Sequence, residues 1–408
     1  MNILVLNAGS TSLKFALFAA EGNDALLSGE IDWPHGNRAQ AWLTILRAGA
    51  RPERARVNVP NGHAAARCAI EVVLREYSVG AAGHRVVHGG AAFRESRRVD
   101  GGVISAMAGL ASLAPLHNPP ALEAIEGVEK ALPGVPQVVV FDTAFFSGLP
   151  EQAYLFGLPY TWHERWGARR YGFHGISIAY CAARAAELLE KSDLRLVICH
   201  LGGGCSATAV KAGVPVRTTM GFSTLDGLMM GTRCGAVDPG LLLYLQRECG
   251  VTLDELDHAL TCESGLLGVS GISADLARIE IAAGQGNPRA RLAFGMFADQ
   301  VRAAIGGLAV GMGGLDALVF TDRIGENSPA LRAAACQGLE CLGVHLEAPH
   351  NHACAADADV ATAQSPARVL VMRTREELMI ARETRRVVAA DCVEALSPNK
   401  NGIEFRPK

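Results

Sequence analysis

Residues 3–18 read ILVLNAGSTSLKFALF, and residues 195–210 read RLVICHLGGGCSATAV. Each stretch is an apolar run, a turn of small residues and a second apolar run. That pattern is typical of two strands joined by a tight connection. The copies lie too far apart in the chain for a solenoid repeat. They indicate two duplicated domains with a nucleotide-binding cleft between them.

Further apolar runs extend this pattern to an α/β fold. Residues 137–141 and 317–321 are continuous apolar stretches, as expected of central strands that are buried on both faces. Helical patterns separate the strands, at residues 178–190, 290–306 and 329–339. Alternation of strands and helices predicts an α/β protein.

The composition is that of a folded protein without a strong charge bias. Of 408 residues, 49% are hydrophobic, and 38 basic residues stand against 41 acidic ones for a net charge of −3. The hydrophobic content excludes a disordered chain. The absence of a basic excess argues against nucleic acid as a partner. Because single cores stop growing near about 250–300 residues, we expect two domains.

The sequence also predicts a cytoplasmic location. None of the 11 cysteines forms a Cys-x-x-Cys pair, which indicates reduced thiols rather than disulfides or a cysteine metal site. The N-terminal apolar run is too short for a secretory signal and no basic segment precedes it. The longest uncharged apolar stretch, residues 303–315, falls short of the ~20 residues that a membrane helix needs. We therefore expect no membrane segment.

Small residues form the first turn, Asn7-Ala8-Gly9-Ser10-Thr11-Ser12. Such a turn leaves backbone N–H groups accessible, so it can approach a phosphate closely. An ordinary hairpin turn is the alternative interpretation. Residues 321–327 follow a predicted buried strand and open a helix, a corner that suits a nucleotide base or a phosphate.

Two arginines stand in glycine-rich segments. Arg85 lies in GHRVVHGG (83–90) and Arg233 lies in MGTRCG (230–235). A planar guanidinium matches the geometry of carboxylate and phosphate groups, so both residues are candidate anion clamps. The alternative for each is a surface arginine beside a turn.

An acid and two histidines complete the candidate set. Asp142 comes directly after a predicted buried strand, where ligands gather in open α/β sheets and where an unpaired charge is costly. His174, between Phe173 and a glycine, can donate to a developing charge, or it can simply start a helix. His117 lies in the rigid segment PLHNPP, where it can contact an anion or hold the loop.

Together these residues indicate chemistry by charge stabilisation. Two arginines, one strand-end carboxylate, two glycine-rich turns and no nucleophile pair favour phosphoryl transfer, which depends on positioning and neutralisation. The sequence lacks GxxxxGK[ST], which excludes a P-loop enzyme, and lacks the H-R-D and D-F-G motifs of protein kinases.

A family resemblance covers nearly the whole chain. The ordered motifs are NAGSTSLKF, GHRVVHGG, PLHNPP, FDTAFF, YGFHG, MGF..L.GLMMGTR, SGLLGVSG and EELMIARET. With these motifs the chain resembles the acetate/propionate kinase family. The resemblance implies two duplicated actin-like ATPase (ribonuclease H-like) domains around a central cleft. We expect residues 1–145, completed by 377–408, to form one domain and residues 146–376 to form the nucleotide-binding domain.

The resemblance also implies an activity and its partners. The reaction would be reversible, direct in-line transfer of the ATP γ-phosphoryl group to acetate, giving acetyl phosphate and ADP without a phospho-enzyme. Mg²⁺, with Mn²⁺ as the alternative ion, would assist, and the protein would form a homodimer. A kinase preferring propionate or butyrate and a catalytically impaired phosphate- or nucleotide-binding regulator are the alternatives.

Roles carry over by motif. Arg85, Arg233, Asp142 and His174 would be catalytic. The acyl and carboxylate site would involve Arg85, Val87, Leu116, His117, Phe173 and Thr224. Nucleotide and phosphates would be bound by Ser10, Ser12, Lys14, His200, Gly202, Gly203, Gly204, Asp275, Arg323, Ile324, Gly325 and Asn327. Asn7 and Glu376 would hold the metal ion.

Four positions depart from the family pattern. Gly203 replaces a usual asparagine, Thr224 replaces a proline, and Arg375 stands beside the metal site. Asp322 and Arg323 replace small residues that give room for the nucleoside. We hypothesise that bulk and charge at 322–323 weaken ATP use and favour a smaller donor such as pyrophosphate. In the alternative, Arg323 turns to solvent and ATP binds normally.

Overall fold

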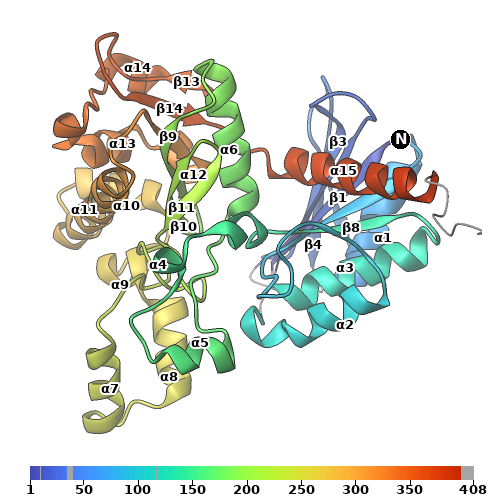
Figure 1. Cartoon of the computed structure of the whole chain (residues 1–408), viewed down its shortest axis with the longest axis horizontal. Coiled ribbons are helices and arrows are strands. Elements are labelled where there is room, and N and C mark those ends of the chain that lie inside the picture. Colours follow the sequence, from blue (N-terminus) through green and yellow to red (C-terminus); the bar gives the residue numbers. More distant parts are fainter. Residues whose placement is uncertain (10, 35–39, 116, 397–408) are drawn as a thin grey trace, which may run out of the picture. The chain divides into compact units, whose positions relative to one another are not determined.

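The structure is a computed structural model that describes residues 1–9, 11–34, 40–115 and 117–396. It divides into two compact units. Unit 1 comprises residues 1–144 together with the chain from Glu377 onward, and unit 2 comprises residues 145–376. Each unit is built around its own β-sheet (Figure 1).

The sheet of unit 1 has the strand order β5-β4-β3-β2-β1-β6-β8-β7. Strands β1 to β5 form an antiparallel meander, whereas β1, β6 and β8 run parallel. The strands are β1 (Ile3–Ala8), β2 (Ser12–Phe18), β3 (Ala25–Asp32), β4 (Ala41–Arg47), β5 (Glu53–Val57), β6 (Ala81–Val86), β7 (Arg97–Arg98) and β8 (Gln137–Phe141).

The sheet of unit 2 has the order β11-β10-β9-β12-β14-β13. Its strands are β9 (Arg195–Leu201), β10 (Cys205–Lys211), β11 (Val214–Thr218), β12 (Ala317–Thr321), β13 (Ala358–Asp359) and β14 (Arg368–Met372). Strands β9 to β11 are antiparallel, and β9, β12 and β14 are parallel. The run β11-β10-β9-β12-β14 thus repeats β3-β2-β1-β6-β8 in order and direction. The predicted duplicated α/β fold is confirmed.

Helices cover both faces of each sheet. In unit 1 these are α1 (Gly62–Leu74), α2 (Gly101–Gly109), α3 (Asn118–Ala131), α15 (Glu376–Leu396) and the 3₁₀ turn η2 (Ala111–Leu113). Helices α1 and α3 bury alanine, isoleucine and valine against β1 to β4 in one core. Helix α15 covers the other face (Figure 1). There a Cβ on Gly83 of β6 would collide with Thr384, so only glycine allows this close approach.

Unit 2 carries the larger helical set. The helices are α4 (Glu151–Tyr154), α5 (Tyr160–Trp166), α6 (Gly175–Leu188), α7 (Pro239–Glu248), α8 (Leu253–His258), α9 (Gly265–Ser270), α10 (Leu276–Gly284), α11 (Pro288–Gly311), α12 (Asp322–Asn327), α13 (Pro329–Cys336), α14 (Ala348–Ala353), and the short turns η3 (Ala144–Gly148), η4 (Ala259–Glu263) and η5 (Leu339–Leu342). Helices α6 and α11 lie on opposite sides of the sheet (Figure 1).

Local sequence explains several of these boundaries. Asn61 and Asp100 cap α1 and α2, each accepting a backbone N–H with its side chain. Thr252 and Glu255 form a capping box at the start of α8. Strands β8 and β12 match the predicted ranges, and all their residues are buried. Helix α6 begins earlier than predicted, at Gly175, because His174 adopts a left-handed conformation that starts it.

Two further sequence expectations can be compared with the structure. Ten cysteines of the described part of the chain are free thiols. Over the described residues, no helix is both long and apolar enough to cross a bilayer.

Candidate active site

In unit 1, three neighbouring strands deliver one polar cluster. Asn7 lies near the end of β1, Arg85 near the end of β6, and Asp142 directly after β8. Because β1, β6 and β8 are parallel and adjacent, their carboxyl ends meet at one sheet edge. The sheet therefore brings together side chains that are far apart in the sequence.

Arg85 and Asp142 form a buried ion pair. The Asp142 side chain is 0% exposed and that of Arg85 is 20% exposed. Nε and Nη2 of Arg85 donate to Oδ2 of Asp142 at 3.0 and 2.6 Å, and Nη1 donates to Oδ1 of Asn7 at 3.2 Å. A buried carboxylate is tolerable only with such charge-assisted partners. The pair fixes the plane of the guanidinium.

The loop after β6 is held by its own polar contacts. The backbone N–H of Gly89 donates to Oγ1 of Thr143 at 2.9 Å, and Nδ2 of Asn118 donates to the His88 carbonyl at 2.9 Å. Val87 in this loop is buried, and His117 is half-buried at the start of α3. These contacts keep the segment after Arg85 in place.

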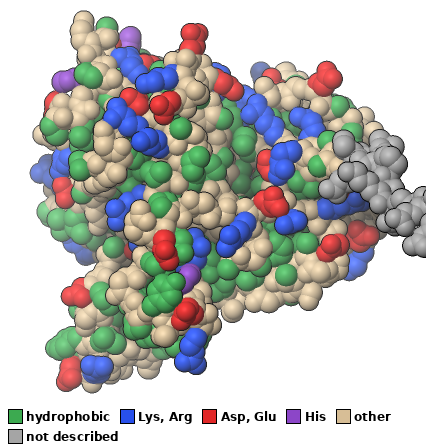
Figure 2. Space-filling view, in the orientation of Figure 1, with side chains coloured by type: hydrophobic (Ala, Val, Ile, Leu, Met, Phe, Trp, Pro, Cys, Tyr) green, Lys and Arg blue, Asp and Glu red, His purple; other side chains and the backbone are tan. Residues whose placement is uncertain are grey.

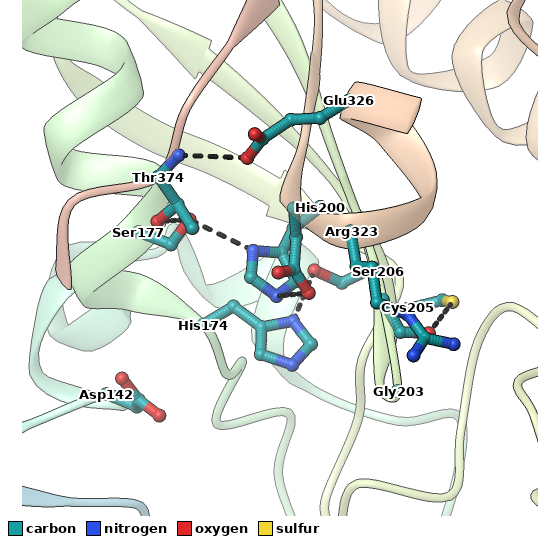
Figure 3. A network of polar contacts seen from close by, with 12 residues as sticks. Asp142, His174, Ser177, His200, Gly203, Cys205, Ser206, Arg323, Glu326 and Thr374 are labelled. Carbon is teal, nitrogen blue, oxygen red and sulfur yellow. Dashed lines mark hydrogen bonds and ion pairs between the residues drawn. The ribbon is translucent and has the colours of Figure 1, made fainter. Parts of the chain in front are cut away.

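In unit 2, His174 stands at the head of α6. Its φ of +60° is unusual for a residue other than glycine. The His174 ring stacks on the His200 ring with centroids 4.0 Å apart, and its Nδ1 lies 3.0 Å from Oγ of Ser206 (Figure 3). Stacking and this hydrogen bond fix the imidazole in one orientation.

A polar chain leads away from the stacked histidines. Nδ1 of His200 lies 2.9 Å from Oγ of Ser177, to which Oγ1 of Thr374 donates at 2.8 Å (Figure 3). The backbone N–H of Thr374 donates to Glu326 at 3.3 Å. Burial raises the pKa of the Glu326 carboxyl. This chain connects β9, α6, α12 and the segment after β14.

The turn Gly202-Gly203-Gly204, called the glycine turn below, connects β9 to β10. A Cβ on Gly204 would lie 2.9 Å from Nε2 of His174 and 3.2 Å from Nη2 of Arg233. A Cβ on Gly202 would collide with the Asp322 carboxylate, whereas one on Gly203 would meet nothing within 4 Å. Two of the three glycines are therefore needed for close approach.

Arg233 is held by backbone carbonyls. Its Nη1 donates to Thr224 at 2.9 Å and its Nη2 to Gly203 at 3.3 Å. Burial lowers the pKa of this guanidinium below its usual value, yet arginine remains protonated at neutral pH. The site therefore presents a fixed positive charge next to the glycine turn and His174.

The departures at 322–323 have distinct positions. Asp322 has a φ of +65°, and its Oδ2 lies 3.3 Å from Nε2 of His200. The Arg323 side chain is 65% exposed and its Nη2 lies 3.1 Å from Oδ1 of Asp275. Arg323 is thus turned toward solvent, as in the milder alternative. Asp322 is the residue that faces the glycine turn.

The other predicted residues are placed as follows. Phe173, His200, Ile324 and Gly325 are buried, while Ser12, Thr224 and Glu376 are half-buried. Lys14, on β2 opposite Asn7, and Asn327, whose Nδ2 donates to the Arg323 carbonyl at 2.8 Å, are exposed. Ser10 and Leu116 lie outside the described residues.

Sequence reasoning missed the supporting hydroxyls. Ser206, Ser177 and Thr374 fix the two histidines, and only Ser206 carried a signal, as the small polar residue that follows the glycine turn in the second sequence copy. Ser177 and Thr374 are 197 residues apart in the chain. No local pattern joins them.

The two residues predicted to hold a metal ion offer oxygen donors. The described residues contain no group of three or more histidine, cysteine, aspartate or glutamate side chains that could hold a metal by themselves. Mg²⁺ characteristically takes one or two protein oxygens and fills its other positions with water and substrate phosphates. The amide of Asn7 and the carboxylate of Glu376 are oxygen donors of that kind.

Comparisons with known proteins agree along almost the entire chain. The Acetokinase family model matches residues 2–382. The acetate kinase of Gloeobacter violaceus is 47% identical over 400 residues, covering 94% of this chain and 98% of that protein. The solved acetate kinase of Porphyromonas gingivalis is 36% identical with a TM-score of 0.87, covering 95% and 99% of the two chains. A propionate kinase from Francisella tularensis is 33% identical with a TM-score of 0.88, covering 95% and 99%.

Proposed function

Because this chain belongs to the acetate kinase family, it is a phosphotransferase with a carboxyl group as acceptor, and we propose that Arg85, Asp142, His174 and Arg233 carry its chemistry. ATP is its phosphoryl donor and acetate its acceptor. An oxygen of the acetate carboxylate forms the new bond to the γ-phosphorus while the bond from that phosphorus to the β–γ bridging oxygen breaks. ADP leaves with the electron pair of that bond, and no phospho-enzyme forms.

Arg85 binds the acetate carboxylate. The carboxylate and the phosphoryl oxygens repel each other, and a guanidinium lowers that repulsion by charge and by its paired N–H donors. Asp142 accepts two hydrogen bonds from Arg85 and so holds the guanidinium in one plane. This buried ion pair is the single observation that supports the assignment most strongly.

Arg233 and His174 stabilise the transferring phosphoryl group. In the transition state negative charge is spread over its three equatorial oxygens, and fixed donors aimed at them lower the barrier. Nη2 of Arg233 and Nε2 of His174 both lie within contact distance of the position that a Cβ on Gly204 would take. The absence of a side chain at Gly204 therefore lets both donors approach the turn at which the phosphates are proposed to bind.

We also propose that Mg²⁺ assists, held by Asn7 and Glu376. The bound ion would neutralise phosphate charge. Chelation with EDTA should abolish turnover, and added Mg²⁺ or Mn²⁺ should restore it. Turnover that persists after complete chelation would refute this assignment.

Acetate and propionate could both react by this mechanism, and the size of the acyl pocket decides which of them is preferred. Val87 and Phe173 are buried apolar residues suited to a small acyl group, and Thr224 replaces the proline usual in the family. We propose acetate as the preferred acceptor, with propionate as the alternative. Steady-state kinetics with acetate, propionate and butyrate decide between them, because one methylene in an apolar pocket changes specificity by about 10–200-fold.

One observation favours pyrophosphate as an alternative phosphoryl donor. The Asp322 carboxylate faces the glycine turn, which places negative charge where the phosphates of ATP are proposed to bind. A hydroxamate assay of acyl phosphate formation, run in parallel with ATP and with pyrophosphate, tests the assignment. Turnover with ATP supports the proposed reaction, and turnover with pyrophosphate alone would replace it. Ligand binding without turnover would indicate the regulatory alternative.

Finally, we propose a homodimer formed through unit 2. Helix α7 buries none of its residues and exposes Leu241, Leu243 and Tyr244, and α5 exposes Trp162 and Trp166. Hydrophobic side chains are visible on this part of unit 2 (Figure 2). Contiguous exposed apolar residues mark interaction surfaces. Sedimentation should give a dimer that Leu243→Glu converts to a monomer.

A further inference from the structure

The segment 220–233, called the site loop below, lies over a cavity. The cavity has a volume of about 570 Å³, and it is lined on the loop side by Asp226 and Leu228 and on the α11 side by Gln300, Ala304 and Gly307. Packing against a filled core normally fixes a loop. Leu228, Met229 and Met230 of the site loop are buried, whereas residues 222–227 are not. The position of the part around Asp226 therefore depends more on polar contacts.

Two side chains supply such contacts. Nη1 of Arg170 donates to Oδ2 of Asp226 at 2.9 Å and to the Thr219 carbonyl at 2.8 Å. Oε1 of Gln300 accepts the backbone N–H of Met229 at 2.8 Å. The side chains of Arg170 and Asp226 are 20% and 33% exposed, so the pair is only partly screened by solvent.

Arg170 belongs to the segment that leads into His174. Beside the ion pair, the backbone N–H of Tyr171 donates to the Gly221 carbonyl at 2.9 Å. Gly172, with a φ of +70°, lies so near the Phe146 ring that a Cβ would approach it to 2.5 Å. The segment that leads into His174 is therefore packed against Phe146 and hydrogen-bonded to the site loop.

We propose that the Arg170–Asp226 pair is a positioning pair for the acyl end of the site. It joins the segment bearing Phe173 and His174 to the loop bearing Thr224 and Arg233. This inference rests on the proposed function, which assigns those four residues to acyl and phosphoryl recognition. A partly exposed ion pair contributes about 1 kcal/mol or less to stability, but a displacement of about 1 Å at a catalytic group can cost about 100-fold in rate. The pair therefore affects the rate by fixing the positions of these residues relative to one another.

The proposal predicts a selective kinetic change. Asp226→Asn keeps the shape of the side chain and removes its charge, so kcat/KM for acetate should fall at least about 10-fold. KM for ATP should rise less than KM for acetate. Arg233 of the site loop donates to Gly203 of the glycine turn, but the turn is also held by the β9–β10 hairpin. Asp226→Glu, which retains the carboxylate, should recover most of the lost activity.

A matched control exists in the same unit. Arg368 and Asp359 form an ion pair at 2.6 Å with side chains 27% and 31% exposed, and it joins β13 to β14. Asp359→Asn should leave all kinetic constants unchanged. Amide hydrogen exchange of residues 220–233 should become faster in Asp226→Asn and not in Asp359→Asn. This readout does not depend on turnover.

The outcomes separate the two ideas. Wild-type kinetics together with unchanged exchange in Asp226→Asn would overturn the positioning role, as would an equal rise of KM for ATP and for acetate. Failure of the wild-type protein to phosphorylate acetate with any donor would overturn the proposed function instead. Even then, unchanged amide hydrogen exchange of residues 220–233 in Asp226→Asn would show that the Arg170–Asp226 pair does not hold the site loop, and faster exchange would show that it does.

Discussion

Replacement of Asp322 by glycine should improve ATP use without a large change in stability. Oδ2 of Asp322 lies 3.3 Å from Nε2 of His200, and the carboxylate occupies the place that a Cβ on Gly202 would need. It therefore adds a negative charge at the proposed phosphate site. The variant Asp322→Gly removes that charge and restores a residue type suited to the observed φ of +65°.

The magnitude follows from distance and screening. For a phosphate charge taken to lie roughly 6 Å from the carboxylate, with an effective dielectric constant of about 40–80, the repulsion is about 0.7–1.4 kcal/mol. That range corresponds to a roughly 3- to 10-fold fall in KM for ATP per charge. Stability changes nearly cancel, because relief of about 1 kcal/mol of left-handed strain offsets at most about 1 kcal/mol from the partly exposed ion pair.

Asp357 offers a close control for this variant. It has a φ of +67°, forms an ion pair with Arg184 at 3.3 Å, and has a side chain 31% exposed against 30% for Asp322. The hydroxamate assay should show a lower KM for ATP in Asp322→Gly, and no change in Asp357→Gly. An unchanged or higher KM for ATP in Asp322→Gly would refute the electrostatic argument and show that the carboxylate aids binding.

Three further outcomes are expected. Asp142→Asn removes the charge that balances buried Arg85. The value of kcat should therefore fall about 100-fold or more, and the free energy of unfolding should fall by about 2–4 kcal/mol. Kinetics measure the first effect and urea titration the second, and a near-native kcat would exclude Asp142 from the chemistry. The new methyl group of Gly204→Ala should push against Nε2 of His174 and Nη2 of Arg233, which should lower kcat about 10- to 100-fold. A Cβ on Gly203 would meet nothing within 4 Å, so Gly203→Ala should match wild type. Equal effects of the two substitutions would contradict this reasoning. Burial lowers the pKa of His84 to about 4, against an ordinary value of about 6.5. Between these two pH values the unfolded state binds more protons than the folded state, so stability should fall by about 3 kcal/mol as the pH drops from 6.5 to 4. The thermal stability of His84→Gln should depend less steeply on pH over this window, and identical slopes for the two proteins would contradict this prediction.

The predictability of this fold varies with how local each signal is. Strands 137–141 and 317–321 were predicted with their observed bounds, because continuous apolar runs persist only where both faces of a strand are buried. Helix α13 ends at Cys336, before the predicted residue 339, because Gln337 has an extended backbone and Gly338 has a φ of +81°. The 3₁₀ turn η5 then begins at Leu339. Side-chain periodicity does not register such a break.

The candidate site divides in the same way. Strand-end reasoning anticipated Asp142, and its pairing with Arg85 follows from adjacent parallel strands. The contact of Asp322 with His200 could not be anticipated, because it depends on a left-handed backbone angle at 322. Bulk at Arg323 looked more disruptive in the sequence, yet its side chain is exposed. Tertiary contacts, rather than residue type, decide which departure matters.

The position of α15 affects how the protein is made. Ile380 and Thr384 of this helix are buried and would be contacted by any Cβ on Gly83 of β6, although β6 is completed early in the chain. Ribosomes add about 5–20 residues per second, so the nascent sheet waits on the order of tens of seconds for its last cover. During that interval an apolar surface is open to chaperones or to aggregation. Release of the polypeptide before residue 377 would make that exposure permanent.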